Sequence, residues 1–239
     1  MVRSLINTAR EVLGPVLELL YPTRCGGCGG HGEVLCRTCR SSFCRPDRSS
    51  ACPICGRQTG RPVVCGACMQ HRQCFEAGYY GFSFEGRARE ALHAFKFQGR
   101  KDVGRALVHL LDEEIGLLAP AFDVVIPLPV TEKRLKKRGF NQSFLIAEEI
   151  ARLTGKAVDC STLRKVKETE DQYLLSREER KKNIRGAFDL TGGAALKGRR
   201  LLLVDDLYTT GNTAREACRI LLRARPGKVL FFALARTPG

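Results

Sequence analysis

The sequence predicts an α/β protein whose mostly parallel sheet carries helices on both faces and is preceded by a small cysteine-rich region. Three observations predict it. Short apolar segments alternate with amphipathic ones through the second half of the chain, as expected for a parallel sheet. Ten of the 12 cysteines lie between Cys25 and Cys74. A length of 239 residues allows one or two domains at about 150 residues each.

We expect three parts, namely an amphipathic helix at residues 1–22, a cysteine-rich region at 23–76 and an α/β domain at 77–239. The chain is 44% hydrophobic and 27% charged, which excludes an intrinsically disordered protein. No apolar run approaches the roughly 18 residues of a membrane-spanning helix, so a transmembrane segment is excluded as well.

The net charge of +15 suits a polyanionic partner such as a nucleic acid. A solvated basic surface, or one that binds a small phosphate ligand, explains the same charge. If a nucleic acid binds, we expect it beside the first cysteines, where four arginines gather: Arg37, Arg40, Arg45 and Arg48.

The N-terminal segment is predicted to be a helix because its apolar residues recur at helical spacing between residues 3 and 20. Asn7, Arg10 and Glu11 interrupt the apolar stretch that a signal peptide requires. The helix packs on its own protein, or it contacts a membrane surface or a partner. Without an export signal we expect a cytoplasmic protein, whose thiols stay reduced.

Eight cysteines form pairs with a two-residue spacer: Cys25/Cys28, Cys36/Cys39, Cys52/Cys55 and Cys65/Cys68. The spacer lets both sulfurs of a pair face one tetrahedral Zn²⁺. Neighbouring pairs give two structural Cys₄ sites, although cross-braced pairing, disulfides and an iron–sulfur cluster remain alternatives. Few large apolar residues lie in this region, so metal binding must supply much of its folding energy. Cys44 and Cys74 are spare or substitute ligands.

In the α/β domain, apolar runs predict strands at 79–84, 123–126, 200–204 and 228–235. Helices are expected near 86–96, 102–117, 141–153 and 213–224, the third of them capped by Asn141. The first strand, with the helix that ends at Lys96, is expected to form an edge strand and lid. Ligands of parallel sheets bind beyond the carboxyl ends of the strands, so the segments after residues 126 and 204 should meet there.

The segment after residue 204 is the most informative part of the sequence. A buried strand leads through Asp205 and Asp206 into a loop with three threonines and Gly211, and a helix follows. Free N–H groups at a helix N-terminus favour an anion, and the two carboxylates suit ribose hydroxyls or Mg²⁺. An ordinary strand–helix turn explains the whole string poorly. A Walker B element would need an upstream Gly-x-x-x-x-Gly-Lys-[Ser/Thr] loop, which is absent from the sequence.

The segment after residue 126 begins with Pro127, Leu128 and Pro129 and continues into five cations, of which Arg138 is the last. We expect a loop that forms either a pyrophosphate cradle or a solvated basic surface. A polar stretch at 165–185 then separates two structured regions and is predicted to be a mobile flap or a surface helix.

The string from Val204 to Thr213 resembles the phosphoribosyl pyrophosphate (PRPP) motif of type I phosphoribosyltransferases. The resemblance implies a phosphoribosyltransferase-like sheet that binds PRPP with Mg²⁺. It also implies that Asp205 and Asp206 hold the ribose hydroxyls. The 5′-phosphate is then assigned to Thr209, Thr210, Gly211, Asn212 and Thr213. By position, Pro127–Pro129 and Arg138 meet the pyrophosphate, and Gln172 and Arg180 lie on a loop that closes over the site.

The chain as a whole resembles the ComF family. The resemblance rests on the paired cysteines, the PRPP motif and three further strings, namely Ile126–Pro129, Arg138–Gln142 and the segment from Gln172 to Phe188. Members of that family are competence-associated proteins with an N-terminal zinc-ribbon region and a phosphoribosyltransferase-like domain. Glutamine amidophosphoribosyltransferase shares the PRPP motif but uses a terminal cysteine nucleophile. Here the first cysteine is Cys25, inside a metal pair, so a glutamine amidotransferase is not expected.

Three functions fit these features. The chain is a phosphoribosyltransferase that displaces pyrophosphate in favour of an unidentified acceptor, or a PRPP sensor without catalysis. Alternatively, it is a zinc-ribbon competence factor in DNA uptake that binds single-stranded DNA or a protein of the competence machinery. His93 and His109 fall in helical segments and are predicted to serve packing or surface roles rather than catalysis.

Overall fold

The computed structural model describes residues 22–70, 74–168 and 184–238 of the chain. The helix expected at residues 3–20 lies outside these ranges, as do Gln172, Arg180 and most of the polar stretch at 165–185. Within the described ranges, no helix has the length and apolar character needed to cross a membrane.

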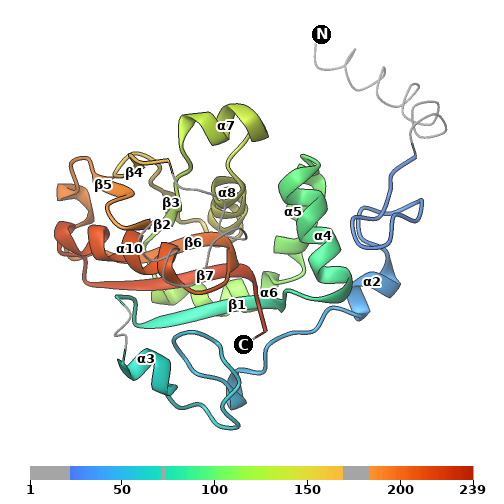
Figure 1. Cartoon of the computed structure of the whole chain (residues 1–239), viewed down its shortest axis with the longest axis horizontal. Coiled ribbons are helices and arrows are strands. Elements are labelled where there is room, and N and C mark those ends of the chain that lie inside the picture. Colours follow the sequence, from blue (N-terminus) through green and yellow to red (C-terminus); the bar gives the residue numbers. More distant parts are fainter. Residues whose placement is uncertain (1–21, 71–73, 169–183, 239) are drawn as a thin grey trace.

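Five parallel strands form the central sheet, in the order β1-β7-β6-β2-β3 (Figure 1). Their bounds are β1 Ala77–Ser83, β2 Val124–Pro127, β3 Ala157–Val158, β6 Arg200–Tyr208 and β7 Lys228–Arg236. The predicted α/β class is confirmed, and β1 is an edge strand as expected. β3 was not predicted because its two residues are too few to show a periodic pattern.

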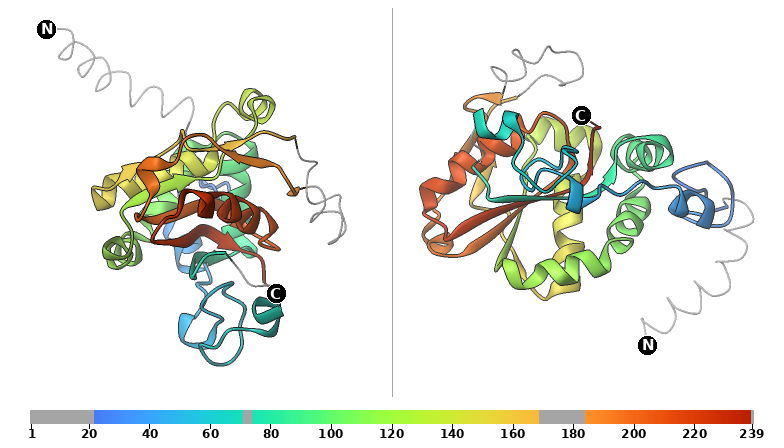
Figure 2. Two further views of the ribbon diagram at one scale, coloured as in Figure 1. Left: turned by 90° about the vertical axis from the view of Figure 1, so that its left-hand side faces the viewer. Right: turned by 90° about the horizontal axis from the view of Figure 1, so that it is seen from below.

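Helices cover both faces of the sheet (Figure 2). On one face pack α4 (Gly86–Phe97), α5 (Lys101–His109), α6 (Asp112–Leu118) and α8 (Gln142–Thr154). On the other pack α10 (Asn212–Leu221) and the antiparallel pair β4 (Leu163–Lys165) and β5 (Phe188–Leu190). Successive strand residues point to opposite faces, so Leu202 belongs to the first core and Leu203 to the second.

Two segments differ from the prediction. The single helix expected at 102–117 is two helices, because the chain turns at the buried Leu111 and α6 begins with three acidic residues that favour a helix N-terminus. The cationic segment expected as a loop contains helix α7 (Glu132–Arg138). The Thr131 hydroxyl accepts a hydrogen bond from the Arg134 amide at its start, and Gly139 ends it with φ 77°.

The cysteine-rich region contributes to both cores instead of standing apart. It contains α2 (Arg37–Ser41), α3 (Gly66–Gln70) and the 3₁₀ turn η1 (Arg48–Ser50); further 3₁₀ turns are η2 (Ala119–Ala121), η4 (Ala194–Leu196) and η5 (Leu222–Ala224). Cys25 and Cys39 belong to the core under α4 and α5, whereas Cys52 and Cys68 belong to the core under α10. The two cysteine groups therefore pack on opposite sides of the sheet.

The second cysteine group lies directly against the edge strand β1. The Gly78 amide donates a hydrogen bond to the Pro53 carbonyl at 2.9 Å, and the Tyr80 hydroxyl donates one to the Ile54 carbonyl at 2.8 Å. A Cβ atom at Gly78 would lie 2.2 Å from the Ile54 oxygen, so only glycine permits this approach. The edge strand is thus covered by backbone of the cysteine group, which protects it from pairing with other chains.

Replacing Gly78 with alanine should therefore push the second cysteine group away from β1. We expect Gly78→Ala to lower the free energy of unfolding by about 1–3 kcal/mol, the usual cost of overpacking a close contact. Gly116→Ala is the matched control, because a Cβ at this helical position meets no atom within 4 Å. Urea denaturation of both variants checks the expectation, and equal stability of the two would contradict it.

Candidate functional site

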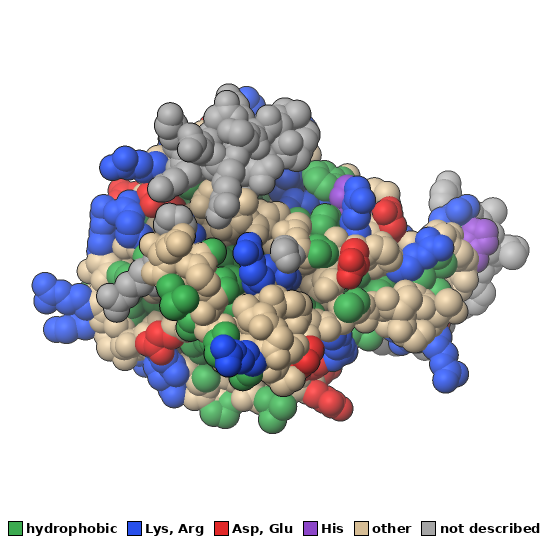
Figure 3. All heavy atoms as spheres, turned by 60° about the horizontal axis from the view of Figure 1, so that its bottom comes forward, with side chains coloured by type: hydrophobic (Ala, Val, Ile, Leu, Met, Phe, Trp, Pro, Cys, Tyr) green, Lys and Arg blue, Asp and Glu red, His purple; other side chains and the backbone are tan. Residues whose placement is uncertain are grey.

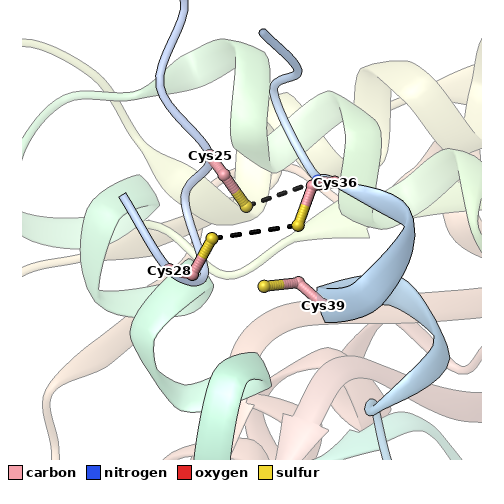
Figure 4. Close-up of side chains that lie close together, drawn as sticks. All are labelled: Cys25, Cys28, Cys36 and Cys39. Atoms are coloured by element: carbon pink, nitrogen blue, oxygen red, sulfur yellow. Dashed lines mark hydrogen bonds between the residues drawn. The ribbon is translucent and has the colours of Figure 1, made fainter. Parts of the chain in front are cut away.

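Each group of four cysteines gathers its sulfurs in a small volume, as Figure 4 shows for the first group. The Sγ atoms lie within 4.8 Å of one another in each of the groups Cys25/Cys28/Cys36/Cys39 and Cys52/Cys55/Cys65/Cys68. Neighbouring pairs therefore combine, which confirms the first of the two predicted arrangements and excludes the cross-braced one. Cys44 and Cys74 belong to neither group.

The sulfur positions suit tetrahedral zinc. Zn–S bonds of about 2.3 Å place two sulfurs about 3.8 Å apart. The Cys28 and Cys36 sulfurs are 3.8 Å apart, and those of Cys55 and Cys65 are 3.6 Å apart. Four thiolates fill all positions of such a site, so the metal stabilises the fold and has no open position for a substrate.

Backbone amides favour the thiolate form, which zinc requires, at one sulfur of each group. The amides of Gly27 and Cys36 donate to the Cys25 sulfur at 3.4 and 3.3 Å. Burial raises the pKa of Cys25, but these hydrogen bonds outweigh it and bring the pKa down to about 6. In the second group, the Cys65 amide donates to the Cys52 sulfur at 3.4 Å in the same way. Such outer contacts orient metal ligands.

A cavity of about 780 Å³ opens at the carboxyl ends of β2 and β6, where ligands of parallel sheets bind. The predicted site residues that line it are Leu128, Pro129, Arg138, Asp205, Asp206, Thr209, Thr210, Gly211 and Thr213. Pro127 is buried at the end of β2 and Asn212 is the first residue of α10, and neither lines the cavity. The two half-sites that the sequence placed after separate strands thus meet in one cavity.

The loop from Thr209 to Thr213 has the features of an anion site. It ends at the N-terminus of α10, where Gly211 is the cap residue with φ 74°. The Thr210 hydroxyl is buried, and within the described ranges no group bonds to it. A buried hydroxyl without a partner is costly unless a ligand supplies one, and the helix N-terminus favours that ligand being an anion.

The two acids are held by different partners. The Lys96 ammonium contacts the Asp206 carboxylate at 2.8 and 3.1 Å. The Asp205 carboxylate accepts hydrogen bonds from the Ser143 hydroxyl at 3.0 Å and from the Asp206 amide at 2.9 Å. Burial, together with the negative charge of Asp206, raises the pKa of Asp205 to about 7.

Positive charge exceeds negative charge in the cavity wall. Two carboxylates face five cations, which are Arg89, Lys96, Arg134, Arg138 and Lys165. Arg134 and Arg138 are four residues apart on α7 and so lie on one side of that helix. Burial and the nearby Arg134 lower the pKa of Lys165 to about 8, which indicates crowding of positive charge. A polyanion is the ligand that such a wall favours.

Lys96 and Lys165 were not among the predicted site residues. They come from α4 and β4, and no local motif marks either position. The Gln142 amide links α4 to the cavity, because it donates to the Lys96 carbonyl at 3.4 Å while its oxygen accepts from Arg138 at 3.4 Å. Gln142 belongs to the Arg138–Gln142 string, which the sequence analysis had singled out. That string was the only sequence feature that pointed to this contact between α4 and the cavity. Asn141 caps α8 as predicted and donates to the Leu128 carbonyl.

The remaining part of the wall is apolar and aromatic. Phe84 stacks on His93 with ring centres 5.9 Å apart, and His93 meets Phe97 edge-on at 5.2 Å. The Arg138 guanidinium lies 5.7 Å from the Phe97 ring centre. His93 thus makes packing contacts as predicted, but within the cavity wall. His109 lies at the surface between Asp112 and Glu149, away from the cavity.

The four arginines beside the first cysteines do not form one free basic surface. Arg40 pairs with Glu33 at 3.4 Å, Arg45 pairs with Glu114, and the Arg48 guanidinium lies 4.0 Å from the Tyr79 ring centre. Figure 3 shows lysines and arginines spread over one face of the molecule among acidic side chains, rather than gathered in a stripe.

Two family profiles match the chain. "Double zinc ribbon domain" matches residues 16–69 and "Phosphoribosyl transferase domain" matches residues 141–239. The first profile agrees with two structural zinc sites at the cysteine groups, and the second identifies the α/β part as phosphoribosyltransferase-like.

Curated relatives match over most of both chains. The DNA utilization protein YhgH of Salmonella typhi is 32% identical over 210 residues, which cover 85% of this chain and 90% of the relative. Competence protein ComFC of Bacillus subtilis is 28% identical, covering 86% of this chain and 85% of its own length. Among solved structures, the B. subtilis glutamine PRPP amidotransferase complexed with ADP and GMP is 20% identical with a TM-score of 0.38, covering 60% of this chain and 30% of that chain. A likeness that small supports no argument.

The two zinc sites can be counted separately by metal analysis. We expect about two equivalents of zinc per chain. Cys28→Ser should remove about one equivalent, because it takes one of four thiolates from the first site. Cys44→Ser, an exposed cysteine outside both groups, is the control and should keep both equivalents. Well under one equivalent in the unaltered protein would contradict both sites.

The buried Asp205 carboxyl should make stability depend on pH. Its pKa is about 7 in the folded protein against about 3.9 in an unfolded chain, so the folded state binds an extra proton between these values. This contribution to stability is lost as pH rises from about 4 to 7. The free energy of unfolding of Asp205→Asn relative to the unaltered protein should therefore rise by about 1 kcal/mol or more across this window. Asp189→Asn, at an exposed position on β5, should show no such trend.

Proposed function

This chain is a phosphoribosyltransferase-like member of the ComF family of competence-related proteins, and we propose that it binds PRPP together with Mg²⁺ in the cavity beyond β2 and β6. One observation carries the proposal. A single cavity combines an anion-binding loop, a pair of carboxylates and a wall with five cations. PRPP has the matching groups in one molecule, namely a phosphate, ribose hydroxyls and a pyrophosphate.

Each group of PRPP is assigned to one part of the cavity lining. The loop Thr209–Thr213 would bind the 5′-phosphate through N–H groups and hydroxyls at the start of α10. Asp205 and Asp206 would accept hydrogen bonds from the ribose hydroxyls. The segment Pro127–Pro129 and the cations Arg134, Arg138 and Lys165 would face the pyrophosphate.

The donor set also suits Mg²⁺, which prefers oxygen ligands and commonly combines one or two carboxylates with substrate phosphates. Asp205 and Asp206 would supply the carboxylate oxygens. The bound metal would neutralise charge on the departing pyrophosphate. The Lys96 ammonium contacts both Asp206 oxygens, at 2.8 and 3.1 Å. Ribose hydroxyls or Mg²⁺ would compete with Lys96 for these oxygens.

We propose transfer as the reaction of this site. The bond between the anomeric carbon and pyrophosphate oxygen breaks, pyrophosphate leaves with the electron pair, and the acceptor forms the new bond to that carbon. The aromatic part of the wall made by Phe84, His93 and Phe97 would receive the acceptor, next to Arg138, whose guanidinium lies over the Phe97 ring. A PRPP sensor would use the same binding residues without releasing pyrophosphate, so pyrophosphate release against a panel of acceptors separates the two.

Relatives named for DNA utilization and for competence support a role of this chain in DNA uptake, and we propose that it acts in the cytoplasm. A single-stranded DNA or protein partner in the competence machinery is part of the same proposal, with the net charge of +15 as its support. The predicted position of a nucleic acid beside the first cysteines has less support, because three of the four arginines expected there already contact Glu33, Glu114 and Tyr79.

Titration calorimetry with PRPP and Mg²⁺ tests the proposal. The unaltered protein should bind, and Asp205→Asn/Asp206→Asn should weaken binding by about 100-fold or more, because hydrogen bonds to charged groups contribute about 1.5–3 kcal/mol each. Asp189→Asn removes an exposed carboxylate outside the cavity and should bind like the unaltered protein. Equal affinity of the double variant and the control would discard the site.

A further inference from the structure

A cluster of aromatic rings connects the second cysteine group to the loop that would bind phosphate. Tyr80 of β1 and Tyr208 at the end of β6 have ring centres 5.0 Å apart. Phe231 of β7 lies 5.5 Å from Tyr208 and 6.1 Å from Tyr80. All three rings lie in the core that also contains the second cysteine group.

One end of this cluster is fixed to the metal-binding turn between Cys52 and Cys55. The Tyr80 hydroxyl donates to the Ile54 carbonyl inside that turn at 2.8 Å. A Cβ at Gly56, just after the turn, would lie 2.6 Å from the Tyr80 ring. The turn and the ring are therefore in close contact, and the shape of the turn is set by zinc, because two of its residues are ligands.

The other end of the cluster supports Gly211. A Cβ at Gly211 would lie 2.2 Å from the Tyr208 hydroxyl, so the loop rests directly on this side chain. The Tyr208 carbonyl also accepts a hydrogen bond from the Thr237 amide at 3.0 Å, which fixes the end of β6. Gly211 is the cap residue of α10, and its position determines where the N–H groups of the helix point.

Among the described residues, no chain of ring contacts joins the first cysteine group to the loop Thr209–Thr213. The group packs on α4 and α5, where the Arg87 guanidinium donates to the Gly27 carbonyl at 3.3 Å and the Arg100 guanidinium donates to the Arg24 carbonyl at 2.8 Å. Neither Arg87 nor Arg100 lines the cavity. The two zinc sites are therefore unequal in their relation to the cavity, although their ligand sets are alike.

We propose that Tyr80 and Tyr208 are positioning residues, through which the second zinc site sets the geometry of the phosphate-binding loop. Full affinity for a ribose 5-phosphate group then requires zinc in the Cys52/Cys55/Cys65/Cys68 site and does not require it in the Cys25/Cys28/Cys36/Cys39 site. This inference rests on the proposed function, because it concerns the affinity of the same cavity. It adds a structural reason for joining a zinc ribbon to this domain.

The test compares three conservative variants: Tyr80→Phe, Tyr208→Phe and, as the matched control, Tyr79→Phe. Tyr79 is adjacent to Tyr80 on β1 but packs with the opposite core, under the Arg48 guanidinium. Binding of ribose 5-phosphate and of pyrophosphate is measured by calorimetry with Mg²⁺, and zinc content is determined on the same samples. Ribose 5-phosphate reports on the loop, whereas pyrophosphate reports on the cations beyond it.

We expect Tyr80→Phe and Tyr208→Phe to weaken binding of ribose 5-phosphate three- to ten-fold, to leave pyrophosphate binding unchanged and to keep both zinc equivalents. Tyr79→Phe should bind both probes like the unaltered protein. A general loss of stability would weaken both probes alike, so an equal loss for the two probes would overturn the inference. Unchanged binding of ribose 5-phosphate in all three variants would overturn it too.

Cysteine variants provide the second measurement. Cys55→Ser should weaken ribose 5-phosphate binding, and Cys28→Ser should not, although each removes one zinc ligand. Equal effects of the two substitutions would overturn the inference. If the unaltered protein bound neither PRPP nor ribose 5-phosphate, the proposed function would fail and this inference with it. Normal binding by the unaltered protein with no difference between the variants would remove the inference alone.

Discussion

Asp205 and Asp206 place two carboxyl groups on consecutive residues at the carboxyl end of β6, where Asp206 is buried and Asp205 is partly buried. Two neighbouring carboxyl groups that are shielded from water are stable only when cations or hydrogen-bond donors contact them. Lys96 supplies the cation for Asp206, and Ser143 with a backbone amide supplies hydrogen bonds for Asp205. Helices α4 and α8 are thereby held over the end of the sheet, and the cavity is the space that remains between them and the loop after β6.

The cysteine-rich region has few large apolar side chains, so it cannot build a hydrophobic core of its own. Metal ligation replaces that core, and the two cysteine groups then pack against opposite faces of the sheet. Backbone from the second group covers the edge strand β1 through Gly78 and Tyr80. The region is thus integrated with the α/β part by packing and by hydrogen bonds.

What the sequence could predict followed from local patterns. Patterns among neighbouring residues were enough to predict four strands, the cap at Asn141, the pairing of the cysteines and the loop at Thr209–Thr213. Lys96 and Lys165 could not be predicted, because their place depends on α4 and β4 crossing to the carboxyl end of β6. The Lys96–Asp206 pair joins residues 110 positions apart. The helix α7 was missed because its cations suggested solvent exposure, which a short helix satisfies as well as a loop.

The charge distribution in the cavity restricts the ligand further than the fold does. An anion without hydroxyl groups would face the two carboxylates of the acid pair with nothing to donate to them. A neutral sugar would satisfy the acids but would bring no negative charge to the basic wall or to the N-terminus of α10. Both demands are met by one molecule that carries hydroxyl groups between two anionic groups. The lining of the cavity is therefore itself a reason to prefer a sugar that carries phosphate groups.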